Sequence, residues 1–452
     1  MSLVARLKAL RRSLADRAGS ELSGLGGDSL YAAIWQASTS IADLAQIALI
    51  THVLGLDELG RLAIAISFVM LVGQFFDVRV GVATTTMGAR ELRRDPNRAT
   101  GLFQLSYLID AVTGVAAFLI VCGLAPLAGP GLIGTDGTLL IVLYAATLLT
   151  GTVEESSLTI LRLLDRYRTV AFFTVALEVA RVLLIVAALL LFDNLVAVMV
   201  VLIAHRALFA AIQFAFAARA SHTATGRSLF GGSALDEVRD LRRRMLKTVF
   251  QTNLVSYGRL TQTQLPTVIV GAIAGTTQAG AYKLGSAAAV MVGRLADPAY
   301  LGLLPRLSRL VAAGDISAVR DLVRRMTYVS VPVMGIALLL LIVFRDPVLA
   351  LLGGEGQSEA AEVLVLCAVA FAINAAVFWN VGVLFAVGRA GVMARVAVVV
   401  AMSQVVLLVP LVEHSGATGA ALALLLTMTG ANIAMTWLAV AHLRRGICRV
   451  EP

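Results

Sequence analysis

The stretch VLGLDELGRL at residues 53–62 has a counterpart, IAGTTQAGAY, at residues 273–282, in an ungapped register shifted by 220 residues. The same register places VGQFFD (72–77) over VGRLAD (292–297). The matched positions are Gly55 with Gly275, Gly60 with Gly280, Gly73 with Gly293, Asp77 with Asp297, Asp95 with Asp315, Leu102 with Leu322 and Gly134 with Gly354. Because all of these matches share one register, the sequence predicts two copies of one structural unit.

The composition places both copies in a membrane. Of the 452 residues, 59% are hydrophobic and only 14% are charged, which leaves too little polar surface for a soluble chain of this length. Runs apolar and long enough to cross about 30 Å of hydrocarbon predict an all-α polytopic protein with twelve spans. The predicted spans are 30–54, 60–82, 101–125, 138–160, 168–192, 195–218, 247–275, 279–304, 323–344, 360–387, 391–412 and 417–442.

The net charge of +9 follows the predicted topology. Basic residues outside the spans gather on alternate loops, whereas the intervening loops hold only Arg61 and Arg345. By the positive-inside rule, both termini are predicted to be cytoplasmic in a multi-pass, bacterial-type inner (plasma) membrane protein. The basic excess is therefore explained without a nucleic-acid partner.

Six spans in each copy make both copies enter the membrane in the same direction. Two six-helix lobes are then predicted to be related by a pseudo-two-fold axis along the membrane normal, with a cavity between them, as in transporters. The predicted organisation is a cytoplasmic basic arm (1–29), an N-terminal lobe with helices 1–6 (30–219), a cytoplasmic linker (220–246), a C-terminal lobe with helices 7–12 (247–443) and a cytoplasmic tail (444–452).

Charged side chains inside the spans mark the candidate site, because an ionised group at mid-bilayer costs about 2.5–3.5 kcal/mol on insertion scales. In AYKLGSAAAVMVGRLADP (281–298), Lys283 and Arg294 fall on one helix face about 16 Å apart. Arg259 lies in a seventh span that is polar nearly all round and is interrupted by Pro266. The candidate substrate-binding residues of the cavity are Arg259, Arg294, Lys283, Arg79 and Asp43. Asp43 continues a polar stripe of the first span with Gln36 and Ser40.

Several of these charges have structural interpretations as well. Glu178 and Arg181 have the i, i+3 spacing of an ion pair within one helix, as do Arg294 and Asp297. Arg206 is expected to pair with Glu178 or to reach an interface, and Lys283 either to face the cavity or to snorkel to the outer boundary. The residues assigned to ion coupling or to bracing between the lobes are Asp77, Asp297 and Glu154.

The sign of the charge points to the cargo. Spans seven and eight carry Arg259, Lys283 and Arg294 against essentially one acid, Asp297. An excess of cationic side chains in a low-dielectric cavity suits an anion, and guanidinium groups bind phosphate oxygens well. The sequence contains no GxxxxGK[ST] loop, no HExxH and no metal-ligand cluster, so we expect no enzymatic activity, cofactor or metal.

The chain resembles the polysaccharide-lipid flippases of the multidrug/oligosaccharidyl-lipid/polysaccharide exporter superfamily. The resemblance rests on LGLDELGRL (54–62), AGAYKLGSA (279–287) and PRLSRLVAAGD (305–315), and it extends over nearly the whole chain. It implies transfer of a polyprenyl-diphosphate-linked oligosaccharide, a cell-surface polysaccharide precursor, from the inner to the outer leaflet by alternating access. It also implies that cationic cavity residues contact the diphosphate or acidic sugars, and it makes glycosyltransferases or a polysaccharide polymerase possible partners.

Two departures separate the chain from this family pattern. Family members often carry an aspartate in the middle of helix 7, where this chain has Gln264-Leu265-Pro266, and a Gly-Leu-Gly-like turn where it has Asp77-Val78-Arg79-Val80-Gly81. The first departure bears on coupling to a cation. Two other functions remain open from the residues alone: a cation-coupled multidrug exporter of the same superfamily, and a non-transporting scaffold for envelope assembly.

Overall fold

The structure, a computed structural model, describes residues 3–76, 80–229, 235, 238–243, 245–246, 262–354 and 356–445. The described residues are overwhelmingly helical and form no β-strand, which confirms the predicted all-α fold. The first lobe contains α1 (Leu3–Phe76), α2 (Val80–Arg94), α3 (Pro96–Ile133), α4 (Gly137–Leu163), α5 (Tyr167–Phe192) and α6 (Leu195–Thr225). The second contains α8 (Leu265–Ala274), α9 (Thr276–Arg294), α10 (Asp297–Ala312), α11 (Ile316–Val343), α12 (Arg345–Leu351), α13 (Ser358–Ala376), α14 (Trp379–Ala386) and α15 (Ala390–Arg445).

Helix breaks divide these elements differently from the predicted spans. The first two predicted spans join in α1, which bends at Gly55, and the last two join in α15, which bends at Ser415 and Gly416. The predicted span 279–304 is instead divided between α9 and α10. Within the described residues, seven helices are long and apolar enough to cross a membrane, so the count of twelve is not confirmed.

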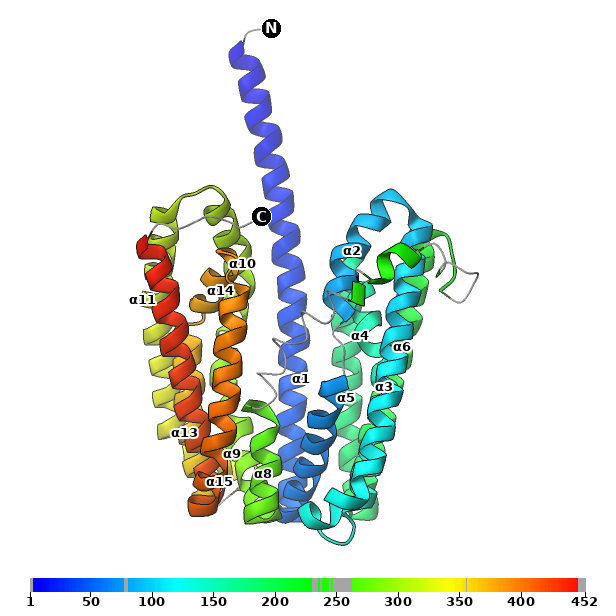
Figure 1. The fold of residues 1–452 in the computed structure, drawn as a ribbon, viewed down its shortest axis with the longest axis vertical. Helices are drawn as coiled ribbons and strands as arrows, with labels where there is room; N and C mark the ends of the chain where they lie inside the picture. The colour runs from blue at the N-terminus through cyan, green and yellow to red at the C-terminus, as the bar shows by residue number, and fades with distance from the viewer. Residues whose placement is uncertain are drawn as a thin grey trace.

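The helices form two bundles with α1 between them (Figure 1). Helices α2 to α6 lie on one side of α1, and α8 to α15 lie on the other. Helix α1 packs against α5 of the first bundle and against α9 of the second. A polar face on α1 therefore has access to side chains from both lobes. The beginning of α1 and the end of α15 lie toward the same end of the molecule.

Matched backbone features confirm the register of the internal repeat. Gly55 bends α1 with φ 85° and ψ 178°, and its counterpart Gly275 separates α8 from α9 with φ 91° and ψ 175°. Positive φ favours glycine, which has no Cβ to clash. The carboxylates of Asp95 and Asp315 each cap a helix, accepting hydrogen bonds from the backbone N–H groups of Asn97 and Ala318. The two copies therefore share local geometry as well as sequence.

The repeat also creates a close contact between the lobes. A Cβ on Gly60 would overlap the backbone carbonyl of Thr276, and a Cβ on Gly280 would overlap the carbonyl of Leu56. These two contacts are reciprocal under the 220-residue shift, because Leu56 corresponds to Thr276. The hydroxyl of Thr276 also donates to Asp57 Oδ1 at 2.5 Å. Helices α1 and α9 can approach this closely only because both positions are glycine.

We expect Gly60→Ala to lower the free energy of unfolding by about 1–3 kcal/mol, because the added methyl must displace backbone rather than a flexible side chain. Thermal unfolding of the detergent-solubilised protein measures this effect. Gly430→Ala in α15 is the matched control, since a Cβ there meets no atom within 4 Å. If both variants unfold at the wild-type temperature, the close contact between α1 and α9 is wrong.

Candidate functional site

A cavity of about 520 Å³ lies between the lobes. Its walls come from α1, α4, α5 and α6 of the first lobe and from α9 of the second. Its charged and titratable lining residues are Asp43, Glu154, Glu178, Arg181, His205, Arg206, Lys283 and Arg294. The structure thus brings three of the predicted cavity residues, Asp43, Lys283 and Arg294, to one place, and it adds Glu154.

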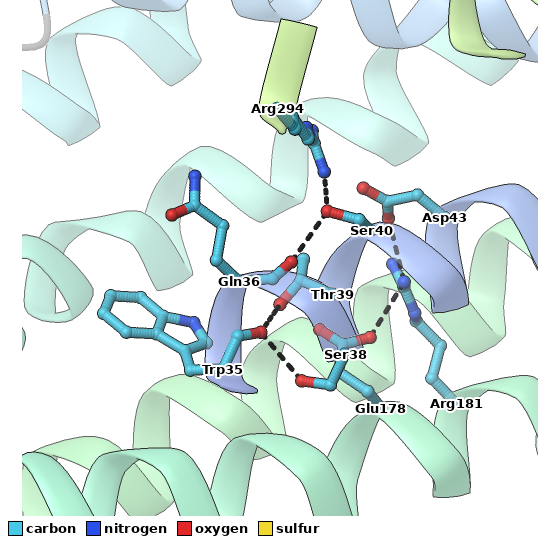
Figure 2. Close-up of polar contacts among 9 residues, drawn as sticks. All are labelled: Trp35, Gln36, Ser38, Thr39, Ser40, Asp43, Glu178, Arg181 and Arg294. Atoms are coloured by element: carbon cyan, nitrogen blue, oxygen red, sulfur yellow. Dashed lines mark hydrogen bonds and ion pairs between the residues drawn. The ribbon is translucent and has the colours of Figure 1, made fainter. Parts of the chain in front are cut away.

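The polar stripe of α1 connects the two lobes (Figure 2). Gln36, Ser40 and Asp43 are spaced i, i+4 and i+7, so they share one face of the helix. Gln36 donates to Asp297 of α10 at 3.3 Å, and Arg294 of α9 donates to the Ser40 hydroxyl. Asp43 instead faces the first lobe, where it binds Arg181. One helical face therefore holds contacts to both walls of the cavity.

Arg181 binds two carboxylates at once. Its guanidinium lies 2.9 Å from Asp43 Oδ1 and 2.8 Å from Glu178 Oε2, and these contacts confirm the predicted ion pair within α5. The Glu178 and Arg181 side chains are only 8% and 11% exposed, whereas that of Asp43 is 46% exposed. Buried ions need such pairing, because the loss of water around them otherwise costs several kcal/mol each.

Arg206 and Glu154 form a second ion pair, between α6 and α4, at 3.0 Å. The expected pairing of Arg206 with Glu178 is therefore wrong, because Glu178 faces Arg181 on its own helix. Spacing along the chain predicted the contact within α5 but not this contact between two helices. Glu154 therefore pairs with Arg206 within the first lobe, and its assignment to ion coupling or to bracing between the lobes stays a prediction.

Lys283 and Arg294 form the cationic part of the α9 wall. Both line the cavity, so Lys283 does not reach away toward the end of its helix. Within the described part of the chain, neither residue forms an ion pair with a carboxylate. Arg294 hydrogen-bonds to Ser40 rather than to the expected Asp297, because the helix breaks between α9 and α10 and the i, i+3 geometry is lost.

The charge is therefore distributed unevenly between the walls. The first lobe contributes two arginines and three carboxylates to the cavity, and the second lobe contributes two cations and no carboxylate. The sequence predicted the cations of the second lobe, but it did not predict the aromatic and amide groups beside them. These additional lining residues are Trp35, Tyr144, Phe209 and Gln213. On α6, the spacing of His205, Phe209 and Gln213 at i, i+4 and i+8 is the signal that was missed.

The other predicted site residues are Asp77, Arg79, Arg259 and Asp297. Asp77, Arg79 and Arg259 lie outside the described residues. Asp297 contacts α1 through Gln36, and its bracing role stays a prediction. Within the described ranges, no group of three or more His, Cys, Asp or Glu side chains is placed to hold a metal ion.

We expect Arg181→Gln to lower the free energy of unfolding by about 3–5 kcal/mol, because it leaves two carboxylates facing each other without a counter-charge. Thermal unfolding in detergent measures the loss. Adding Asp43→Asn and Glu178→Gln to this variant should restore much of the stability. Arg345→Gln is the control, because its pair with Asp346 is exposed and should contribute about 0–1 kcal/mol. Equal effects of Arg181→Gln and Arg345→Gln would contradict a buried ion-pair cluster.

The fold resembles solved transporters at low sequence identity. An inward-facing multidrug resistance MATE family transporter of the MOP superfamily has a TM-score of 0.67 and 12% identity, covering 91% of this chain and 96% of that chain. The Vibrio cholerae MATE transporter VcmN in its bent form has a TM-score of 0.61 and 18% identity, with coverage of 95% and 98%. A MOP superfamily transporter from Pyrococcus furiosus has a TM-score of 0.63 and 13% identity, with coverage of 94% and 96%. These likenesses show a shared two-lobe fold.

No curated protein matches the chain as a relative. A family model described as polysaccharide biosynthesis protein matches residues 25–311, which is more than half of the chain. This match agrees with the cavity between two lobes and with the resemblance found in the motifs. The chain is a multi-pass membrane transporter, and it belongs to the polysaccharide biosynthesis protein family of the multidrug/oligosaccharidyl-lipid/polysaccharide exporter superfamily.

Proposed function

We propose that this transporter flips a polyprenyl-diphosphate-linked oligosaccharide from the inner to the outer leaflet by alternating access. The observation that supports this proposal is the cationic α9 wall, where Lys283 and Arg294 line the cavity and, among the described residues, form no ion pair with a carboxylate. A half-buried cation without a counter-charge carries a free-energy cost, and a bound diphosphate supplies that charge. The membership in a polysaccharide biosynthesis family supports a sugar-bearing cargo.

Arg294 is the proposed primary phosphate contact. Its present partner, the Ser40 hydroxyl, is a neutral acceptor. Replacing it with a phosphate oxygen gives a charge-assisted hydrogen bond, which is roughly twice as strong. Lys283 adds a second positive charge on the same face of α9. Arg79 and Arg259, which the sequence places inside predicted spans, are proposed as further contacts.

The proposed orientation makes the cavity open to the inner leaflet. The contact of Gly60 and Gly280 joins the lobes beside the α8–α9 turn, away from the beginning of α1. If both termini are cytoplasmic, as the positive-inside rule predicts, this contact lies on the outer side. Transport then requires the contact to open while the opposite ends of the lobes approach, with Asp297 and Asp77 bracing the inner side. Solved relatives of the same fold have inward-facing and outward-facing conformations.

A cation-coupled multidrug exporter is the second candidate. The MATE transporters of similar fold and the carboxylates Asp43, Glu154 and Glu178 in the cavity favour it. However, each of these carboxylates already forms an ion pair with an arginine. Binding of a cationic drug would have to displace those arginines and would bring the drug close to Lys283 and Arg294. The charges therefore favour the anionic cargo.

We expect Arg294→Gln to slow flipping by about 10- to 100-fold, because a charge-assisted hydrogen bond contributes about 1.5–3 kcal/mol and each 1.4 kcal/mol is tenfold. Proteoliposomes carrying a fluorescent polyprenyl-diphosphate sugar measure this rate when an impermeant quencher reports the exposed leaflet. Lys283→Gln should also slow flipping. Arg309→Gln is the matched control, because Arg309 is an exposed arginine of α10 that does not line the cavity.

Normal flipping by both cavity variants would exclude the α9 wall as the phosphate site. Export of a cationic dye such as ethidium, driven by an imposed ion gradient and without any flipping, would identify a multidrug exporter. Wild-type behaviour of the cavity variants together with loss of function in loop variants would identify a scaffold.

A further inference from the structure

One face of α6 presents unsatisfied hydrogen-bonding groups to the cavity. His205, Phe209 and Gln213 follow one another at intervals of four residues, and all three line it. Gln213 is 1% exposed, and its Oε1 has no hydrogen-bond partner in the protein. Nε2 of His205 also has no hydrogen-bond partner in the protein. Buried polar atoms are rarely left without a partner, so these two point to a ligand.

Whether these unpartnered atoms donate or accept hydrogen bonds decides which part of a ligand they can bind, its phosphates or its sugar. Gln213 Oε1 is an acceptor, whereas Nε2 of His205 accepts or donates according to the tautomer of the ring. A phosphate oxygen is also an acceptor and cannot bond to Gln213 Oε1. Nε of Arg181 is an unpartnered donor on the same wall. Sugar hydroxyl groups both donate and accept, so they match this mixture of groups.

Aromatic side chains from α1, α4 and α6 also line the cavity. Trp35, Tyr144 and Phe209 line the cavity beside the polar groups. One face of the Trp35 ring carries the guanidinium of Arg162 at 4.8 Å, and Phe209 packs edge-on against Phe173 at 5.6 Å. These contacts hold the rings of Trp35 and Phe209 in place. Rigid aromatic surface interspersed with a few convergent polar groups is typical of a small-molecule site.

The charge of this wall defines the class of sugar. Its two arginines, Arg181 and Arg206, are each bound to carboxylates, which are Asp43, Glu178 and Glu154. Three carboxylates against two arginines leave an excess of negative charge. A uronic-acid carboxylate on this wall would meet arginines that already bind carboxylates, and it would be repelled by the excess negative charge. An uncharged sugar meets no such repulsion.

We propose that the α5–α6 wall, with His205, Gln213 and the Arg181 cluster, binds the first sugar of the cargo and selects an uncharged sugar over an acidic one. The inference rests on the proposed function, in which Lys283 and Arg294 hold the diphosphate on the opposite wall. The cargo then spans the cavity with its phosphates on the second lobe and its sugar on the first.

Three short-chain probes with the same diphosphate charge test the proposal: farnesyl methyl diphosphate, glucosyl diphosphofarnesol and glucuronosyl diphosphofarnesol. The last two differ only at C6 of the sugar. We expect calorimetry on the full-length protein in detergent to give about tenfold tighter binding of the glucosyl probe than of either other probe, as expected for a site built to satisfy hydroxyl groups.

Variants assign this preference to the wall. His205→Leu and Gln213→Leu should each remove most of the advantage of the glucosyl probe and leave the affinity for the methyl probe within about twofold. His222→Leu, at an exposed position near the end of the same helix, should change nothing. Glu178→Gln should narrow the gap between the glucosyl and glucuronosyl probes several-fold, because it removes the excess negative charge.

The outcomes separate this inference from the proposed function. If Arg294→Gln weakens all three probes and the wild type binds them equally, the phosphate site stands and the sugar site is wrong. If the wild-type protein binds the glucuronosyl probe as tightly as the glucosyl probe, or more tightly, the proposed selectivity is wrong. This result needs only the wild-type protein, so it does not depend on whether the leucine variants fold. Loss of all three probes in the leucine variants overturns the sugar site, and failure of the wild type to bind any probe overturns both proposals.

Discussion

The double ion pair of Arg181 determines the electrostatics of the cavity. A single guanidinium between Asp43 and Glu178 compensates charges from two helices, α1 and α5, and fixes them relative to each other. Without it, the buried carboxylate of Glu178 would lack a counter-charge, which carries a large free-energy cost. Arg206 and Glu154 do the same for α6 and α4. Both arginines of the first lobe are therefore held by carboxylates, so the cations of the second lobe are those available to a ligand.

The internal repeat explains why two walls of such different charge face each other. Gly60 and Gly280 allow α1 and α9 to pack with backbone in contact at equivalent points. That packing brings Ser40 next to Arg294 and places Lys283 across from Asp43 in the same cavity. The two copies thus share the local geometry of their matched segments, but their cavity side chains have diverged. The scaffold is nearly symmetric, whereas the site is not.

The features that follow from local rules could be predicted from the sequence. Gly55 and Gly275 occupy backbone conformations that only glycine adopts readily, and Asp95 and Asp315 each cap a helix. Because both pairs are separated by 220 residues, they identify the repeat in the sequence. The common face of Lys283 and Arg294 follows from helical geometry. Contacts between helices could not be predicted in this way. The pairing of Arg206 with Glu154 depends on how α4 and α6 are rotated and offset relative to each other.

The partner of Arg294 shows the same limit at shorter range. Spacing pointed to Asp297, but the break between α9 and α10 separates the two side chains, and both bind α1 instead. The unsatisfied atoms of His205 and Gln213 were also hidden, because whether a polar atom has a partner is a property of the packed structure. Sequence indicates which side chains a helix presents, but not what they meet.

On the proposed function, the uneven walls supply a reason for the lobes to move. A ligand shifts a conformational equilibrium only by its difference in affinity for the two states. A cargo held by phosphate on α9 and by sugar on α5 and α6 makes all of its contacts only at one separation of the lobes. Binding also exchanges the Ser40–Arg294 hydrogen bond for a phosphate contact, which loosens α9 from α1. A ligand confined to one wall would bind equally well in both states, and it would therefore bind without being transported.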